Sequence, residues 1–138
     1  MIVYLDTSAV LRVLLRQEKP LPEWGRWQRA YASEMLFVEA RRAFDRLRLA
    51  GALDDGGVIA AQRALQQVEA AVGRIRLGRM VLRRAAQPMG VAVRTLDAIH
   101  LASAVLFQER RGETIVFATH DVQQARGAQA LGLDCIGV

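Results

Sequence analysis

Two carboxylates follow apolar stretches that have the length and composition of buried strands. Asp6 comes directly after Ile2–Leu5, and Asp121 comes shortly after Thr114–Ala118. In an open α/β sheet, ligands bind beyond the carboxyl ends of the strands. Aspartate is also among the preferred N-cap residues, so each side chain could instead cap the helix that follows it. Position alone therefore fits a ligand site and helix capping equally well.

Two further carboxylates lie on predicted helices among apolar neighbours. Asp97 lies in the first turn of a helix that is apolar on nearly every side, where it could complement the helix dipole. Glu39 lies one turn into the helix predicted over Glu34–Leu49, which is too deep to cap that helix. A salt bridge to Arg42 or Arg46 on the same helix is the ordinary alternative for Glu39.

The chemistry of these acids depends on whether the fold brings them together. Two carboxylates about 5 Å apart repel each other by roughly 3 kcal/mol at an effective dielectric constant near 20. A site that gathers several of them needs a compensating cation, and all-oxygen ligand sets suit Mg²⁺ or Mn²⁺ rather than zinc. The sequence therefore predicts a divalent metal site, and its ligands would be Asp6, Glu39, Asp97 and Asp121.

The elements that must position these acids alternate along the chain. Short runs rich in β-branched residues predict strands, and longer runs with helical periodicity predict helices. The strands are expected at Ile2–Leu5, Thr114–Ala118 and Asp134–Val138. The helices are expected at Thr7–Arg16, Glu34–Leu49, Ile59–Val72, Met80–Gln87, Leu96–Phe107 and Val122–Leu131. This order predicts an α/β protein with a short central parallel sheet and helices on both faces, in a single domain over residues 1–138.

Turn and capping residues divide these elements. Ser33 is the expected N-cap of the helix over Glu34–Leu49. Asp54 and Asp55 lie in a glycine-rich turn, where a pair of caps explains them better than a role as ligands. The segment 20–32 begins with Pro-Leu-Pro and is interpreted as a connection between two helices.

Composition restricts the class of protein. The chain has 138 residues, of which 52% are hydrophobic, and this is enough to bury a core without disulfides. Its formal charge is +5, and all but one of its 19 basic residues are arginines. This surplus weakly favours an acidic partner such as nucleic acid, although a GC-rich genome also enriches arginine.

Cellular location is inferred from features of the same kind. Cys135 is the only cysteine, which indicates a reducing compartment and a buried structural thiol rather than a nucleophile. No basic leader is visible, and no run approaches the roughly 18 apolar residues of a membrane span. We therefore expect a cytoplasmic protein that does not bind a membrane.

Four segments together resemble a known family. They are LDTSAVL, SEMLFVEARRAF, RTLDAIHLASAVLF and FATHDVQQARGAQALGL. In this order and spacing they resemble the PIN-domain ribonucleases, and above all the VapC toxins of toxin–antitoxin pairs. The resemblance implies that Asp6, Glu39, Asp97 and Asp121 are catalytic residues holding one or two Mg²⁺ or Mn²⁺ ions. These ions would activate water for attack on an RNA phosphodiester.

The resemblance also implies partners and reveals one departure. It implies a VapB-type antitoxin, a homodimer, and an RNA substrate such as a tRNA or ribosomal RNA loop, which offers unstacked bases. Apolar helix surface over Glu34–Leu49 and Ile59–Val72 would permit the homodimer, although core packing explains that surface too. Some relatives carry a further acid shortly after Asp121, where this chain has the non-acidic segment 122–124.

Several polar residues could support the site. Thr7, Ser8 and Thr119 lie beside two of the acids and could contact a metal-bound water or the scissile phosphate, or could cap helices. His100 lies one turn after Asp97, on the same helix face, and a structurally bonded imidazole is the preferred interpretation over a general acid or base.

Basic and aromatic residues are candidates for binding RNA or a partner. Arginines flank three of the four acidic segments, where they could attract a polyanion or form a solvated helix surface. They are Arg12, Arg16, Arg41, Arg42, Arg46 and Arg94. Trp24 and Trp27 lie in a segment without a family pattern, which could determine specificity for substrate or partner.

Three functions remain open at the level of sequence. The first is a metal-dependent endoribonuclease of the VapC type. The second is a non-catalytic module that binds RNA or protein on the same fold, which analogy of fold cannot exclude. The third is a metal-dependent phosphatase, although the chain has no Asp-x-Asp motif and no glycine-rich phosphate loop.

Overall fold

A five-stranded parallel sheet forms the centre of the protein. The computed structural model describes residues 1–138. The strand order is β3-β2-β1-β4-β5, and every neighbouring pair is parallel. The strands are β1 Ile2–Leu5, β2 Arg29–Ser33, β3 Gly73–Ile75, β4 Val116–Ala118 and β5 Asp134–Ile136. The predicted α/β class and the parallel sheet are confirmed.

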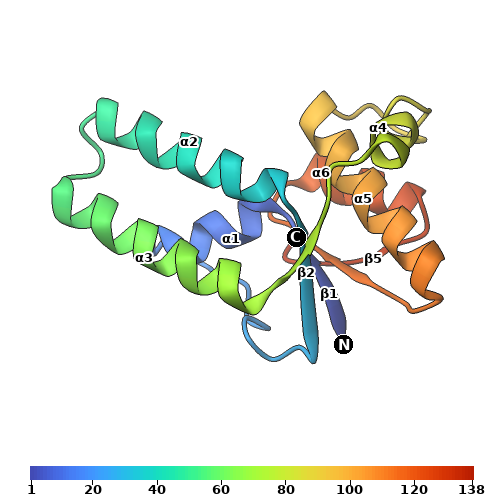
Figure 1. The fold of residues 1–138 in the computed structure, drawn as a ribbon, viewed down its shortest axis with the longest axis horizontal. Coiled ribbons are helices and arrows are strands. Elements are labelled where there is room, and N and C mark those ends of the chain that lie inside the picture. Colours follow the sequence, from blue (N-terminus) through green and yellow to red (C-terminus); the bar gives the residue numbers. More distant parts are fainter.

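Six helices cover the two faces of this sheet. They are α1 Thr7–Leu14, α2 Met35–Leu49, α3 Asp55–Ala71, α4 Arg79–Ala85, α5 Thr95–Arg111 and α6 Val122–Ala130. Figure 1 shows α2 and α3 side by side on the left of the sheet, with α4, α5 and α6 on the right. None of the helices is both long enough and apolar enough to cross a membrane.

Alternation along β1 divides the core into two layers. Val3 and Leu5 face a cluster built with α1, α2 and α3, while Tyr4 faces a cluster built with α4, α5 and α6. Successive strand residues point to opposite faces, so one short strand supplies both layers. The tyrosine is the only polar side chain on this strand, and its hydroxyl needs a partner inside the protein.

Two strands were not predicted from the sequence. β2 lies in the segment interpreted as a connection, and its sequence RAYAS holds two alanines and no β-branched residue. β3 has three residues and starts with Gly73, so neither propensity nor length marks it as a strand. Both strands form through pairing with an existing edge, since β2 pairs with β1 and β3 pairs with β2.

Helix boundaries follow the predicted signals with small shifts. Asp54 caps α3 by accepting a hydrogen bond from Gly57 N at 2.7 Å, whereas Asp55 belongs to the helix itself. Ser33 ends β2 rather than capping α2, although its hydroxyl accepts a hydrogen bond from Met35 N at 3.2 Å. The parallel strand therefore extends to the start of the helix that follows it.

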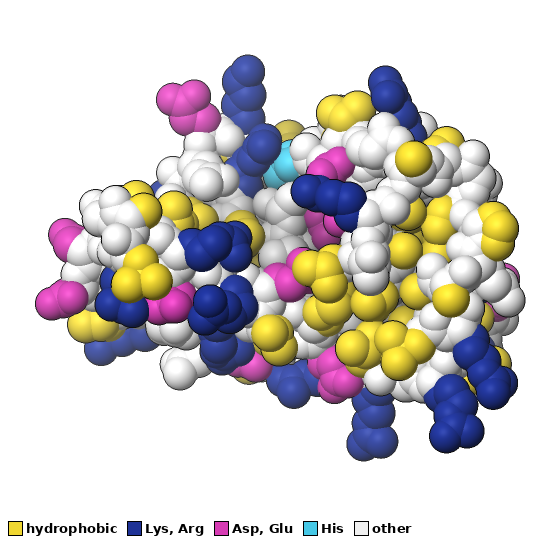
Figure 2. Space-filling model, turned by 90° about the horizontal axis from the view of Figure 1, so that it is seen from above, with side chains coloured by type: hydrophobic (Ala, Val, Ile, Leu, Met, Phe, Trp, Pro, Cys, Tyr) yellow, Lys and Arg dark blue, Asp and Glu magenta, His cyan; other side chains and the backbone are white.

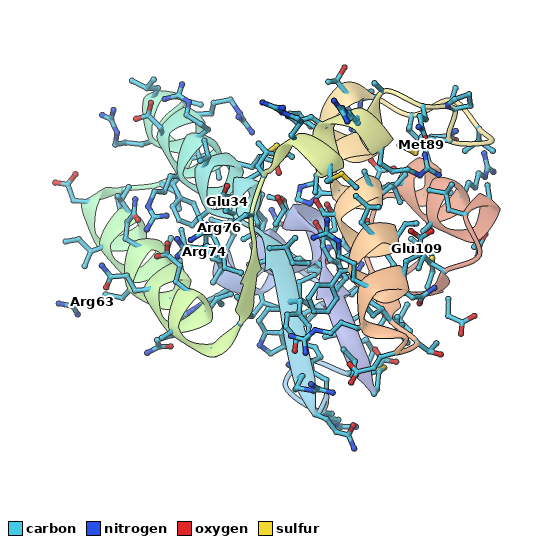
Figure 3. The ribbon with its side chains drawn as sticks, turned by 45° about the vertical axis from the view of Figure 1, so that its right-hand side comes forward. Glu34, Arg63, Arg74, Arg76, Met89 and Glu109 are labelled. Carbon is cyan, nitrogen blue, oxygen red and sulfur yellow. The ribbon has the colours of Figure 1, made fainter.

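The β3 edge of the sheet is covered by charged side chains. Figure 3 shows Arg74 and Arg76 beside Glu34, at the junction of β3 with the start of α2. Arg74 pairs with Glu69 at 3.3 Å, and its guanidinium lies over the Phe37 ring. Glu34 accepts a hydrogen bond from Leu77 N at 2.8 Å. Charge on an edge strand discourages pairing with another sheet.

Candidate functional site

The sequence-predicted acids lie around the carboxyl ends of β1 and β4. These strands are neighbours, and Asp6 N continues their pairing by donating to Ala118 O at 3.0 Å. Asp6 follows β1, and Asp121 follows β4 after a short loop. Glu39 is in α2 and Asp97 is in the first turn of α5, so each acid comes from a different element.

Asp6 is almost entirely buried and is fixed by one of its two oxygens. Only 3% of the residue is exposed. Its Oδ2 accepts hydrogen bonds from Ser8 N at 3.1 Å, Ser8 Oγ at 2.6 Å and Thr119 Oγ1 at 3.0 Å. Its Oδ1 lies 3.8 Å from His100 Nε2 and accepts no hydrogen bond. Asp6 is thus the N-cap of α1 and still has an oxygen for another role.

Asp121 divides its oxygens in a similar way, whereas Asp97 caps no helix and has a partner at one oxygen only. Asp121 Oδ1 caps α6 by accepting from Gln123 N at 2.8 Å and Gln124 N at 2.9 Å. Asp121 Oδ2 lies 3.4 Å from Arg94 Nη2, and Asp97 Oδ2 lies 3.1 Å from Arg94 Nε. For Asp6 and Asp121, helix capping therefore leaves one oxygen for a ligand site, so the two roles are compatible.

The hydroxyl groups beside the acids hold the two chain segments together. Ser8 Oγ lies 3.1 Å from Thr119 Oγ1 and accepts a hydrogen bond from His120 N at 2.9 Å. Thr119 Oγ1 in turn accepts from Asp121 N at 3.0 Å. These bonds join the start of α1 to the loop after β4, so Ser8 and Thr119 fix the position of Asp6.

Glu39 pairs with a histidine rather than with an arginine. Its Oε1 lies 2.6 Å from His100 Nε2 and accepts a hydrogen bond from Thr7 Oγ1 at 2.8 Å. The alternative of a salt bridge to a helix neighbour is wrong, because Arg42 instead pairs with Asp45 at 3.2 Å. Glu39 points from α2 toward the carboxyl end of β1, and its Oε2 accepts no hydrogen bond from the protein.

His100 is buried and bonded at both ring nitrogens. Tyr4 Oη lies 2.8 Å from Nδ1, which gives the continuous chain Tyr4–His100–Glu39. The prediction of a bonded imidazole is confirmed, and the structure adds that its partner is a site carboxylate. Tyr4 is the residue that the sequence analysis missed. The signal for it was a lone tyrosine in an otherwise aliphatic buried strand.

Charge is stabilised in this buried chain. Burial acts to lower the pKa of His100, but the hydrogen bond to Glu39 and the Asp6 carboxylate outweigh it, so the pKa is raised. Asp97 acts in the same direction. Burial acts to raise the pKa of Glu39, but the hydrogen bond with His100 outweighs it, so that pKa is lowered. Burial also raises the pKa of Tyr4, which therefore stays neutral.

Three of the four acids border two adjoining cavities with basic rims, and the buried Asp6 lines neither. The larger cavity, of about 830 Å³, has Glu39 and Asp97 in its wall together with Arg42, Arg46 and Arg94. The smaller cavity, of about 530 Å³, includes Asp121, and Arg46 lines both. Figure 2 shows acidic side chains within a hollow on this face and basic side chains around it.

The donor chemistry fits a hard divalent cation. Asp6, Glu39 and Asp97 each have one carboxylate oxygen that accepts no hydrogen bond, and no thiol lies among them. Oxygen donors of this kind suit Mg²⁺ or Mn²⁺. In the arrangement of this structure, however, no three acidic, histidine or cysteine side chains lie close enough together to hold an ion. The acids are instead linked in pairs, by His100 and by Arg94.

Comparison with known proteins identifies the family. The PIN domain family matches residues 3–129, so the chain belongs to the PIN domain family. No curated protein matches the chain in sequence.

Three solved structures share the fold at low sequence identity. A member of the VapBC family of toxin-antitoxin systems, VapBC-5 from Mycobacterium tuberculosis, superposes with a TM-score of 0.69 at 18% identity, covering 99% of this chain and 98% of that chain. PAE2754 from Pyrobaculum aerophilum superposes with a TM-score of 0.63 at 21% sequence identity. The match covers 97% of this chain and 83% of that chain. FitAcB from Neisseria gonorrhoeae superposes with a TM-score of 0.61 at 17% sequence identity. The match covers 99% of this chain and 96% of that chain.

Proposed function

We propose that this chain is a metal-dependent endoribonuclease that acts as the toxin of a type II toxin–antitoxin pair. One observation carries the proposal. Four carboxylates from separate segments surround the carboxyl ends of β1 and β4, and three of them border cavities rimmed by arginines. An acidic floor for a metal ion and a basic rim for a polyanion are the two features that phosphodiester hydrolysis requires.

The chain's own residues would divide the work. The ion would be held by Asp6, Glu39, Asp97 and Asp121. When bound, Mg²⁺ or Mn²⁺ would polarise the phosphoryl oxygens and lower the pKa of the attacking water. His100 and Thr7 would keep Glu39 in its orientation, since each bonds to Glu39 Oε1. Ser8 and Thr119 would do the same for Asp6.

The rim arginines would bind the RNA backbone. Arg46 is exposed, lines both cavities and forms no ion pair, so its guanidinium is free to bind phosphate. Arg12 lines the smaller cavity, where its Nη1 donates only to Lys19 O at 3.3 Å. A single strand or a loop of tRNA or ribosomal RNA is the substrate class we propose, because its phosphates and bases are accessible.

Partners are proposed from the structural neighbours and from the surface. VapBC-5 is a member of a toxin–antitoxin family, and we propose a VapB-type antitoxin for this chain. We also propose a homodimer through apolar side chains left exposed on α2 and α3, among them Leu49 and Ile59. Sedimentation of the wild type and an Ile59→Asp variant tests the homodimer, which the variant should weaken.

A cleavage assay tests the enzyme. Purified protein is incubated with labelled single-stranded RNA in Mn²⁺, Mg²⁺ or EDTA, beside an Asp97→Asn variant that keeps the size of the side chain. We expect metal-dependent cleavage that falls at least 100-fold in the variant, in line with the loss of an essential catalytic group. Asp45→Asn is the matched control, because Asp45 is an acid on α2 that pairs only with Arg42 and Arg48.

Other outcomes would assign other functions. RNA binding without cleavage in any metal would contradict the nuclease and favour a binding module. Hydrolysis of a small phosphate ester with RNA left intact would favour the phosphatase. Cleavage that survives both EDTA and Asp97→Asn would show contamination, or a site built from other residues.

A test in cells addresses the toxin role. Induced expression in a bacterial host should arrest growth for the wild type but not for Asp97→Asn at equal protein level. Co-expression with the antitoxin should restore growth. If growth is unimpaired while the purified enzyme cleaves RNA, the result would support the ribonuclease activity and contradict the toxin role.

A further inference from the structure

Arg94 occupies an unusual position between two acids of the site. It is the N-cap residue of α5 but makes no side-chain capping bond. Its Nε lies 3.1 Å from Asp97 Oδ2 and its Nη2 lies 3.4 Å from Asp121 Oδ2. No other basic side chain forms an ion pair with either acid. One guanidinium therefore links an acid of α5 to an acid at the start of α6.

The two halves of the site balance their charge in different ways. Glu39 has the buried His100, and Asp6 Oδ2 has three hydrogen-bond donors. Both sets of partners are fixed by packing and by hydrogen bonds. Asp97 and Asp121 have only Arg94 as a charged partner. Asp97 thus has a single cation from the rim as its partner, and Asp121 has that cation together with two N–H groups at the start of α6.

The contacts of Arg94 are suited to release. Its side chain is 81% exposed, and it reaches each carboxylate through one nitrogen rather than through a two-point fork. Exposed ion pairs of this kind are weak and are screened by salt. A divalent cation bound to these carboxylates would bring two positive charges close to the guanidinium and would repel it.

After release from the two carboxylates, Arg94 would still lie beside the site. Its backbone is fixed at the start of α5, and it lines the larger cavity together with Thr95, Leu96 and Asp97. A guanidinium freed there can bind a phosphate in two-point geometry. The same side chain can therefore pair with the acids when no metal is bound, and bind the RNA backbone when metal is bound.

We infer that Arg94 is a built-in counter-ion that competes with the metal ion for Asp97 and Asp121 and, once displaced, binds an RNA phosphate. This inference rests on the metal site of the proposed function. It assigns to one residue two effects of opposite sign, on metal affinity and on RNA affinity.

The first measurement uses Mn²⁺ alone, without RNA. Titration calorimetry of the full chain should give a dissociation constant for Mn²⁺ about three- to tenfold lower in Arg94→Ala than in the wild type, because an exposed competing cation is removed. Arg42→Ala is the matched control, since Arg42 lines the same cavity but pairs with Asp45. We expect its constant to change less than about twofold.

Three results of this titration would overturn the competition. They are an unchanged constant in Arg94→Ala, a higher constant in that variant, and an equal decrease in Arg42→Ala, which would indicate a general effect of charge. Equal thermal unfolding of all three proteins is expected because both arginines are exposed.

The second measurement uses RNA at saturating Mn²⁺. In Arg94→Ala the KM for single-stranded RNA should rise, and the slope of log KM against log salt should flatten by about 0.7, the value for one phosphate contact. An unchanged KM and slope would overturn the role in RNA binding. If the wild type does not cleave RNA but Arg94→Ala binds Mn²⁺ more tightly, the competition holds and the proposed nuclease fails.

Discussion

The Tyr4 hydroxyl bonds to a buried histidine at the edge of the candidate site. Tyr4 is fully buried, and its Oη lies 2.8 Å from His100 Nδ1. Because both ring nitrogens of His100 have partners, the ring orientation is fixed with Nε2 toward Glu39. A positioning role for Tyr4 follows, since the hydroxyl acts on Glu39 only through the imidazole.

Tyr4→Phe tests this role. The ring is kept, but Nδ1 of a buried histidine loses its partner, so we expect the free energy of unfolding to fall by about 1–3 kcal/mol. Urea unfolding measures the change, and Mn²⁺ titration reports whether Glu39 has lost its orientation. Tyr31→Phe is the matched control, because the Tyr31 hydroxyl interacts with the exposed side chain of Arg29 rather than with a buried partner. Equal losses in both variants would contradict the importance of the Tyr4–His100 bond.

Cys135 has a property that can be tested by chemical modification. Burial raises the pKa of its thiol, and the neighbouring Asp134 carboxylate acts in the same direction. A raised pKa means less thiolate at any given pH, so alkylation by iodoacetamide should be slower than for free cysteine. The pH–rate profile should be displaced to higher pH, and Asp134→Asn should move it partly back. A profile that coincides with that of free cysteine would contradict this assignment.

At the scale of single residues, the sequence predicted where the four acids lie in the fold better than it predicted their hydrogen-bond partners. Asp6 and Asp121 were marked by their places after strands, and Glu39 by its depth in an apolar helix. The pairing of Glu39 with His100 could not be predicted, because it joins α2 to α5 across the end of the sheet. Such long-range contacts depend on the packing of elements, which the local pattern does not specify.

At the scale of elements, the sheet edge depends on one close contact. A Cβ at Gly73 would clash with the Tyr31 ring, and these two residues are paired between β2 and β3. The Tyr31 ring also packs against Phe107 of α5, with ring centroids 4.3 Å apart, so it cannot move freely. Glycine at the first position of β3 is therefore required by the packing of the neighbouring strand.

Gly73→Ala tests this contact. We expect a loss of about 1–3 kcal/mol in the free energy of unfolding, typical of an overpacked site. Gly78→Ala is the matched control, because a Cβ there meets nothing within 4 Å. Adding Tyr31→Ala should remove most of the effect of Gly73→Ala, and a double-mutant cycle of urea unfolding measures this coupling. Independent effects of the two substitutions would contradict the contact.

Local composition decides which strands the sequence could predict. β1 and β4 were predicted because their apolar runs hold β-branched or aromatic residues and are buried on both faces. β2 and β3 were missed because their sequences, RAYAS and GRI, are alanine- or glycine-containing and carry arginines. Their strand character comes from the neighbours that they pair with, and no window of the sequence contains that information.

At the scale of the whole molecule, the distribution of charge matters more than its sum. The net charge is +5, yet the proposed site has an acidic floor. A polyanion approaching this floor would be repelled unless arginines at the rim compensate, so attraction of RNA depends on where the cations lie. Arg46, which lines both cavities without an ion pair, is the arginine best placed to do this.

The salt dependence of RNA cleavage measures this arrangement. For single-stranded RNA, each phosphate contact contributes about −0.7 to the slope of log affinity against log salt. Arg46→Ala should therefore lower kcat/KM at low salt and flatten its salt dependence by about 0.7. Arg83→Ala removes an equal charge from an exposed position of α4 that lines none of the principal cavities. A general effect of net charge predicts equal changes in the two variants, whereas a phosphate contact at the rim predicts a change in Arg46→Ala alone.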